Sequence, residues 1–373
     1  MKRPTRKNLA LMLLLAFMLT VVAGCADKKE ESQTAPPAAG QELLVGFIYV
    51  GPPGDAGWTY AHDQGRKYLE EKLPYVKTIF QESVSEGADA ERALNELAQK
   101  GCKVIFATSY GFMDSVIQVA PKYPDVVFMH CSGYKRDANV GTYFGRDYQP
   151  RYLSGLVAGK MTKSNEIGYV AAYPIPEVIR CINAFTVGVR EVNPSATVKV
   201  VWTNTWYDPA KEKQAALSLI EDGCDLITQH QDSYAAQQAA EEKGVLAIGC
   251  DSDMHPFAPN ANLTSPIFNW GDYYVRTVEQ VKNGTWKSGD YWGGLEDGIV
   301  ALAPISDKVP ADVKQNVAAQ ETGLKEKKFD VFKGPVKDQQ GNIKIEAGQT
   351  MSDQDMLALN WFVEGVVGTI PAQ

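Results

Sequence analysis

Side chains that could bind a small molecule lie just past the carboxyl ends of several predicted strands. They are Trp58, Tyr110, Trp206, the group from His230 to Asp232 and the group from Asp251 to Asp253. In parallel α/β sheets, ligands bind at the carboxyl ends of the strands. If two lobes face each other with these ends inward, we expect the side chains to converge on one cleft.

The types of these residues indicate what such a cleft would bind. Two indole rings and a phenol form flat apolar walls, and aspartate and asparagine oxygens accept hydrogen bonds from N–H groups. This combination suits a planar heterocycle that carries N–H groups, and it also suits a sugar, since sugars stack on tryptophan. For each residue the alternative is core packing or a solvated turn. Trp202 alternates with Val198 and Val200 and is expected to pack in the core.

The sequence lacks the common catalytic motifs. No G-x-G-x-x-G follows a predicted strand, and a P-loop lysine, H-E-x-x-H and G-x-S-x-G are also missing. The histidines have no partner at metal-ligand spacing, and the carboxylate pair Asp251 and Asp253 has no nucleophile beside it. We therefore expect a protein that is not an enzyme and that uses no metal or cofactor.

Length and charge restrict the possible functions further. The chain has 373 residues, of which 45% are hydrophobic and 22% charged, an ordinary globular composition that is long enough for two domains. Its formal net charge is -8. An acidic body argues against binding of nucleic acid and against electrostatic docking on anionic lipid.

The N-terminus is predicted to be a targeting segment. Four basic residues precede an apolar run over residues 9–22 that is short for a membrane span. The following Val-Ala-Gly-Cys resembles a bacterial lipobox, in which the cysteine is lipidated and becomes the mature N-terminus. We expect a signal peptide over residues 1–24, a lipid anchor on Cys25 and a flexible, Pro/Ala-rich tether over residues 25–41. An uncleaved anchor and plain secretion are the alternatives.

The five cysteines after Cys25 are predicted to be buried free thiols. Cys102 and Cys224 precede strand-like runs, whereas Cys131 and Cys250 follow them. If these strands are parallel neighbours, each pair lies at opposite strand ends, about 15 Å apart. A disulfide needs Cα atoms within about 7 Å of each other.

Strand-like and helix-like segments alternate along the chain, which is the pattern of a doubly wound sheet. The first unit is a strand over residues 43–50, a Gly/Pro turn and a helix over about residues 59–72. The pattern restarts after residue 147, and the segments 86–109 and 208–231 align with each other, each with a helix, Gly-Cys and a strand. Two similar lobes are therefore expected. A β-hairpin with Gly341 at its turn and an amphipathic helix over residues 352–366 are expected to close the chain.

Six blocks of this sequence resemble the basic membrane protein family. They are GFIYVGPPGDAGWTYAHDQGR, FGRDYQPRYLSGLVAG, IPEVIRCINAFTVGVREVNP, DPAKEKQAALSLIEDGCDLI, GVLAIGCDSD and FKGPVKDQQGNIKIEAG. Members of this family are lipid-anchored solute-binding proteins of ABC importers, and many are purine nucleoside receptors. The resemblance implies a type I periplasmic-binding-protein fold: two doubly wound α/β lobes with parallel sheets, joined by a multi-strand hinge. The first lobe would take residues 42–147 and about 270–292, and the second 148–269 and about 293–373.

The resemblance also implies roles for particular residues. Trp58 and Trp206 would stack on the base, Asp251 would hold ribose hydroxyls, and Asn183 would face the cleft. Tyr110 and His230 join this ligand-binding set because they follow predicted strands. Two departures weaken the ribose half of the site: the family's Ser-Phe-Asn is Gly-Trp-Thr at residues 57–59, and a basic residue is replaced by Phe268.

The sequence as a whole predicts a monomeric, lipid-anchored receptor outside the cytoplasm of a bacterium. It would capture a purine, either adenine or a purine nucleoside, and deliver it to an ABC permease. A sugar or other small solute in the same fold, an anchored enzyme and a surface interaction protein remain the alternatives.

Overall fold

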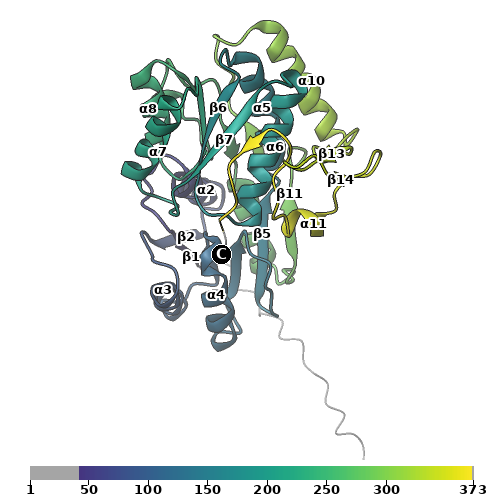
Figure 1. The fold of residues 1–373 in the computed structure, drawn as a ribbon. Coiled ribbons are helices and arrows are strands. Elements are labelled where there is room, and N and C mark those ends of the chain that lie inside the picture. Colours follow the sequence, from purple (N-terminus) through teal and green to yellow (C-terminus); the bar gives the residue numbers. More distant parts are fainter. Residues whose placement is uncertain (1–41, 372–373) are drawn as a thin grey trace, which may run out of the picture. The chain divides into compact units, whose positions relative to one another are not determined.

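The computed structural model describes residues 42–371 and contains two parallel β-sheets, each flanked by helices (Figure 1). The predicted signal peptide, the lipidation site Cys25 and the tether lie outside the described residues. Among the described helices, none is long and apolar enough to cross a membrane.

The first lobe is built on a six-stranded sheet with the order β11-β5-β4-β3-β1-β2. Its strands are β1 (Leu43–Ile48), β2 (Val76–Gln81), β3 (Val104–Ala107), β4 (Val127–Cys131), β5 (Val140–Gly145) and β11 (Asp290–Gly293). All of its strand pairs are parallel. The central strands are buried along their length because helices cover both faces, which explains their continuous apolar runs.

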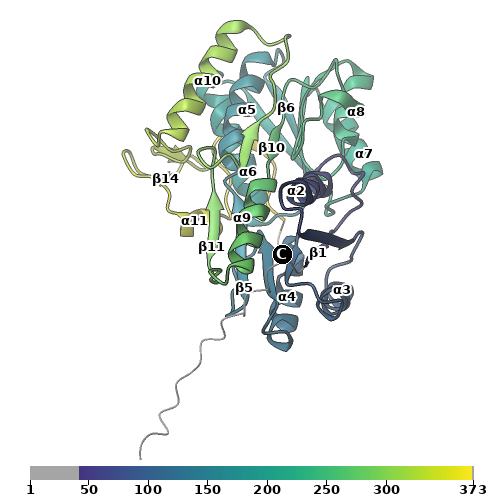
Figure 2. The same cartoon turned by 180° about the vertical axis from the view of Figure 1, so that it is seen from behind.

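Helices on the two faces of this sheet come from distant parts of the chain. They are α2 (Trp58–Lys72) and α9 (Gly271–Lys282) on one face, and α3 (Ala88–Gln99) and α4 (Met113–Val119) on the other. Figure 2 shows α9 beside α2, although about two hundred residues separate them in the sequence. Tyr274 on α9 packs edge-on to Phe47 of β1, with ring centroids 5.3 Å apart.

The second lobe is built on a five-stranded sheet with the order β15-β7-β6-β8-β9. Its strands are β6 (Glu166–Ala171), β7 (Thr197–Trp202), β8 (Leu226–His230), β9 (Leu246–Ile248) and β15 (Val366–Val367). The helices are α5 (Tyr148–Met161), α6 (Pro176–Val192), α7 (Pro209–Glu221), α8 (Ala235–Lys243) and α10 (Ala311–Lys325). Helices α5 and α6 approach each other closely because Gly155 and Gly188 have no Cβ. A Cβ added to Gly155 would lie 2.2 Å from the Phe185 carbonyl oxygen, and one added to Gly188 would lie 2.1 Å from the Tyr152 carbonyl oxygen.

The remaining elements are short. They are the antiparallel pair β10 (Pro266–Phe268) and β12 (Val300–Leu302), the hairpin β13 (Val336–Lys337) and β14 (Ile343–Ile345), the 3₁₀ turns η1 (Tyr110–Phe112), η2 (Ala120–Lys122) and η3 (His255–Phe257), and α11 (Asp353–Leu357). Gly341 lies at the tip of the hairpin with φ +83°, as predicted for that turn.

The chain passes between the two lobes three times, at residues 145–148, 268–271 and 293–300. The passages are tied together by backbone hydrogen bonds: the Arg146 amide donates to the Gly293 carbonyl at 2.6 Å, and the Asn269 amide donates to the Ile299 carbonyl at 2.8 Å. The predicted fold class, two doubly wound lobes joined by a multi-strand hinge, is confirmed.

The predicted helix over residues 352–366 is wrong. Ser352 does cap a helix, since its side chain accepts a hydrogen bond from the Asp355 amide, but α11 ends at Leu357. Phe362, Val363 and Val366 are buried, and β15 pairs with β7. The apolar residues beyond Leu357 therefore reach the core from an irregular segment and a strand. Their spacing in the sequence resembles that of a helix, so the apolar pattern alone could not exclude a helix.

The five cysteines of the described chain are free and buried, as predicted. We expect none of them to react with a thiol reagent in the native protein, because burial raises their thiol pKa values, that of Cys102 to about 12. Titration with Ellman's reagent checks this expectation. Reactive thiols are counted in the native protein and again after denaturation, both without reductant. If the denatured chain shows two reactive thiols fewer than expected, a disulfide is present and the prediction of free cysteines is wrong.

Candidate functional site

A cavity between the two lobes collects most of the residues that the sequence singled out. It is lined by Val50, Trp58, Ser109, Tyr110, Ser132, Glu177, Trp206, His230, Asp232 and Asp251. The space among them, part of which is open to solvent, amounts to about 320 Å³. The lining residues follow the carboxyl ends of strands in both sheets, so the two sets of strand ends face each other, as the sequence predicted.

Trp58 is held rigidly at the start of α2. Its indole Nε1 donates a hydrogen bond to the Thr108 carbonyl at 2.6 Å. The rings of His62 and Phe268 meet it edge-on, with centroids 4.5 and 5.5 Å away. The side chain is only 8% exposed, and the part that these neighbours leave uncovered lines the cavity. The indole is thus oriented before any ligand arrives, which reduces the entropy cost of stacking.

Trp206 lines the cavity from the second lobe. Its ring lies 5.1 Å from that of Tyr173 and 6.5 Å from that of His230, and its carbonyl accepts a hydrogen bond from the Asp232 amide. Trp202 does not line the cavity. It is partly buried and stacks on Phe362 of the C-terminal segment, in line with its expected packing role.

Phe268 occupies the position where the resemblance predicted a lost basic residue, and its side chain continues the aromatic support of Trp58. It is buried and stacks on Trp270 at 4.6 Å. Among the lining residues of the described cavity there is no lysine or arginine. The cavity therefore offers aromatic surface and hydrogen-bonding groups but no direct cationic contact.

Asp251 is held in an unusual backbone conformation at the end of the second sheet, with φ +64°. Behind it, the buried Arg151 donates hydrogen bonds to the Gln229 carbonyl at 2.6 Å and to Cys250 Sγ at 2.7 Å. Burial raises the pKa of Asp251 to about 7, and the nearby Arg151 guanidinium opposes this rise.

Within residues 42–371, two polar atoms of the cavity residues lack a protein partner. They are Oδ2 of Asp232 and Nδ1 of His230, both buried. Burial raises the pKa of Asp232, and the carboxyl groups of Asp55 and Asp251 raise it further. Burial and the charge of Arg151 lower the pKa of His230 to about 3, so its imidazole is neutral at physiological pH. Buried polar atoms without a protein partner require water or a ligand.

The structure brings five of the six predicted ligand-binding residues together, and it corrects the sixth. Trp58, Tyr110, Trp206, His230 and Asp251 all line the cavity. Asn183 does not: its Nδ2 donates to the Trp361 carbonyl at 2.8 Å, and its Oδ1 accepts from the Val363 amide at 3.0 Å. Asn183 thus fixes the irregular C-terminal segment instead of facing the cleft.

The physical reason is the helical period. Glu177 and Asn183 are both on α6, six residues and therefore about 240° apart around the helix. Once Glu177 faces the cavity, Asn183 must face elsewhere. The sequence pattern did not indicate Glu177, because this residue lies in the first turn of a helix and not directly at a strand end. Ser109 lies two residues after β3 and Ser132 directly follows β4, so the strand-end rule could have found them.

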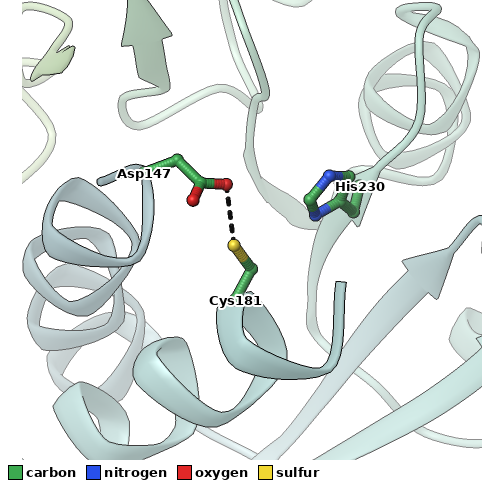
Figure 3. Close-up of side chains that lie close together, drawn as sticks. All are labelled: Asp147, Cys181 and His230. Carbon is green, nitrogen blue, oxygen red and sulfur yellow. Dashed lines mark hydrogen bonds between the residues drawn. The ribbon is translucent and has the colours of Figure 1, made fainter. Parts of the chain in front are cut away.

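Asp147, Cys181 and His230 form a second cluster (Figure 3), of which His230 also lines the cavity. The Cys181 thiol donates to Asp147 Oδ2 at 2.7 Å, and possible ligand atoms of all three lie within 4.8 Å of one another. The sequence spacing could not show this group, because its members come from three separate segments. Arg180 Nη2 lies 4.0 Å from Asp147 Oδ1, and burial raises the thiol pKa of Cys181. A thiol that donates a hydrogen bond beside a buried guanidinium fits internal support of the site better than metal binding.

The loop after β1 joins the two lobes across the cavity. The Asp55 carboxylate accepts hydrogen bonds from the amides of Gly57, Thr59 and Tyr60 at the start of α2. The adjacent Ala56 forms a β-bridge with Ser233, and its carbonyl accepts a hydrogen bond from the Ser252 hydroxyl. These contacts hold the lobes in a closed arrangement.

Two solved structures share the fold of this chain. A solute-binding protein of an ABC transporter system from Aeropyrum pernix K1 superposes with a TM-score of 0.68 at 18% identity, covering 85% of this chain and 98% of that one. A solute-binding protein from Conexibacter woesei DSM 14684 superposes with a TM-score of 0.64 at 22% identity, covering 77% and 98%.

The sequence then defines the family. The family model for PnrA-like ABC transporter substrate-binding proteins matches residues 43–340, so this chain belongs to that family. A purine-binding protein of Brucella abortus (strain 2308) is 47% identical over 89% of this chain and 95% of its own length. A putative ABC transporter glucose-binding protein of Haloferax volcanii is 41% identical over 90% of this chain and 83% of its own length.

The closed arrangement depends on Gly57. A Cβ at this position would lie 2.3 Å from the Asp232 carbonyl oxygen, across the lobe boundary. We expect Gly57→Ala to shift the protein towards an open form with a larger radius of gyration, measured by small-angle X-ray scattering. The control is Gly54→Ala in the same loop, where nothing lies within 4 Å of an added Cβ. Equal radii for wild type and both variants, with unchanged thermal unfolding, would contradict the role of Gly57 in closure.

Proposed function

We propose that this ABC transporter substrate-binding protein captures a purine, either adenine or a purine nucleoside, in the cavity between its lobes. The observation that carries the proposal is the pair of tryptophans that line one cavity from opposite lobes, Trp58 and Trp206, together with carboxyl groups that accept hydrogen bonds. The relative at 47% identity that is named a purine-binding protein supports the same ligand class.

The expected strength of this arrangement suits a receptor. Stacking of one base on one aromatic ring contributes about 1–3 kcal/mol, and a hydrogen bond to a charged group about 1.5–3 kcal/mol. At the upper end of these ranges, two rings and one such hydrogen bond contribute about 9 kcal/mol, whereas micromolar affinity corresponds to about 8.2 kcal/mol after the costs of ordering, so further hydrogen bonds in the cavity must contribute. Closure of the lobes around the ligand would give the bound form a distinct surface, which a transporter can recognise.

A second candidate ligand is a sugar. The relative at 41% identity is named a putative glucose-binding protein, and sugars also stack on tryptophan. Against a sugar, the hydroxyl-binding basic residue expected from the resemblance is replaced by Phe268, which packs against Trp58. We therefore favour the purine, and the proposal includes no catalytic step.

The site of action follows from the same proposal. We infer that the protein is held outside the cytoplasm by acyl chains on Cys25, acts as a monomer and delivers its ligand to the permease subunits of an ABC importer. The supports are the lipobox-like residues 22–25 and the family to which the chain belongs.

The stacking role is tested by Trp58→Ala. Loss of one stacking surface should weaken adenine binding about 5- to 150-fold, the range that corresponds to about 1–3 kcal/mol. Isothermal titration calorimetry with adenine, adenosine, ribose and glucose measures the effect and ranks the ligands. Trp202→Ala is the matched control, since Trp202 lies outside the cavity lining and its loss should leave the affinity unchanged. Micromolar binding of glucose with none of adenine or adenosine would refute the purine.

The anchor is tested separately by Cys25→Ala in the full chain. Expressed in a bacterium, the wild-type protein should partition into the detergent phase of Triton X-114. The variant should lose the acyl chains, because it has no thiol to lipidate, and should partition into the aqueous phase. Equal partitioning of both forms would exclude lipidation at Cys25.

A further inference from the structure

Glu177 places a carboxyl group on the cavity wall at the boundary of the two lobes. It lies in the first turn of α6, and its side chain is 12% exposed. The Ser132 hydroxyl of the first lobe hydrogen-bonds to it, and its Oε1 lies 3.7 Å from Nε2 of His230. None of the residue roles that the resemblance implies falls on Glu177.

Burial favours the neutral form of Glu177. Among the ion pairs of residues 42–371, the only partner of Glu177 is His230, and that imidazole is neutral. Burial raises the pKa of Glu177 to about 7, while Arg180 and Arg151 oppose the rise from a greater distance. The acidic or titratable groups that also face it are Tyr110 on η1, Cys131 of β4, Asp147 before α5, and Asp232 and Asp251 after β8 and β9.

Resting on the proposed function, we propose that Glu177 determines specificity by binding the edge of the base in its protonated form, donating one hydrogen bond and accepting another. A protonated carboxyl group offers one donor beside one acceptor. The matching ligand is a base with the complementary pair on one edge, as in adenine, where the 6-amino group lies beside the ring nitrogen N7. An ionised carboxylate offers acceptors only and would meet N7 with repulsion.

The geometry explains why Glu177 carries this role rather than the other two carboxyl groups of the cavity. Asp251 shares the guanidinium of Arg151 and has a similarly raised pKa, so position and not protonation separates it from Glu177. Asp232 lies on the loop that closes against Gly57. Glu177 stands beside Trp206 and His230, where the edge of a base stacked between the two tryptophans would reach it.

The first experiment measures adenine binding by calorimetry at about pH 6 and about pH 8.5. Because the bound form holds the proton, wild-type affinity should fall as the pH rises through the pKa of Glu177, by about 30-fold over this interval. Glu177→Gln keeps a donor beside an acceptor at every pH, so its affinity at pH 6 should stay within about threefold of wild type and its pH dependence should be markedly weaker. Comparison of the two proteins removes the contribution of Asp55 and Asp251, which titrate in the same range.

The second experiment tests direct contact with a double-mutant cycle. Unsubstituted purine lacks the 6-amino group, so it should bind wild type about tenfold more weakly than adenine, and Glu177→Ala should abolish most of that difference. Glu71→Gln on the exposed surface of α2 serves as the control, since its side chain is 74% exposed. Thermal unfolding verifies that each variant is folded.

The outcomes separate this inference from the proposed function. If wild type binds adenine but Glu177→Gln loses affinity as strongly as Glu177→Ala, the carboxylate acts in its ionised form and the inference is overturned. The same holds if the pH dependence of wild type and Glu177→Gln is equal, or if the cycle shows no coupling. If wild type binds no purine at all, the proposed function itself fails, and this inference fails with it.

Discussion

The carboxyl groups of the cavity are withdrawn from water with no lysine or arginine among the lining residues, and this constraint governs the site. Charged carboxylates are costly to bury, so each pKa rises and the groups become available as donors as well as acceptors. Arg151, one layer deeper, limits the cost at Asp251. The buried atoms that remain unpaired, on Asp232 and His230, make an empty closed cavity less favourable than one filled by a ligand.

The same constraint links ligand binding to lobe closure. In the closed arrangement Trp58, His230 and Asp232 are buried, and the loop after β1 meets the second lobe at Ser233 and Ser252. A ligand that hydrogen-bonds to the unpaired atoms binds the closed arrangement more tightly than the open one. It therefore stabilises the closed arrangement by that difference in binding free energy. The three passages between the lobes allow such a motion without breaking either sheet, since each sheet keeps its own strands.

Much of the fold could be predicted from the sequence because it is written in local patterns. The apolar run over residues 43–50, the Gly/Pro turn and the polar helix after it correspond to β1, its loop and α2. Residues directly after strands converge in any doubly wound sheet, so Trp58, Tyr110 and Asp251 could be assigned to one cleft. The apolar positions after Ser352 misled the prediction, because burial there comes from a strand and an irregular segment and not from a helical face.

The sequence by itself determined the two lobes, the strand ends that meet and the aromatic character of the cleft, because these follow from the periods of strands and helices and from turn residues. Only the tertiary structure decided the rotation of α6, which directs Glu177 to the cavity and Asn183 to the C-terminal segment. It also decided that Phe268 supports Trp58 and that Asp147, Cys181 and His230 form one cluster. These outcomes depend on contacts between segments far apart in the chain, and the burial that sets the pKa values exists only after those segments have packed.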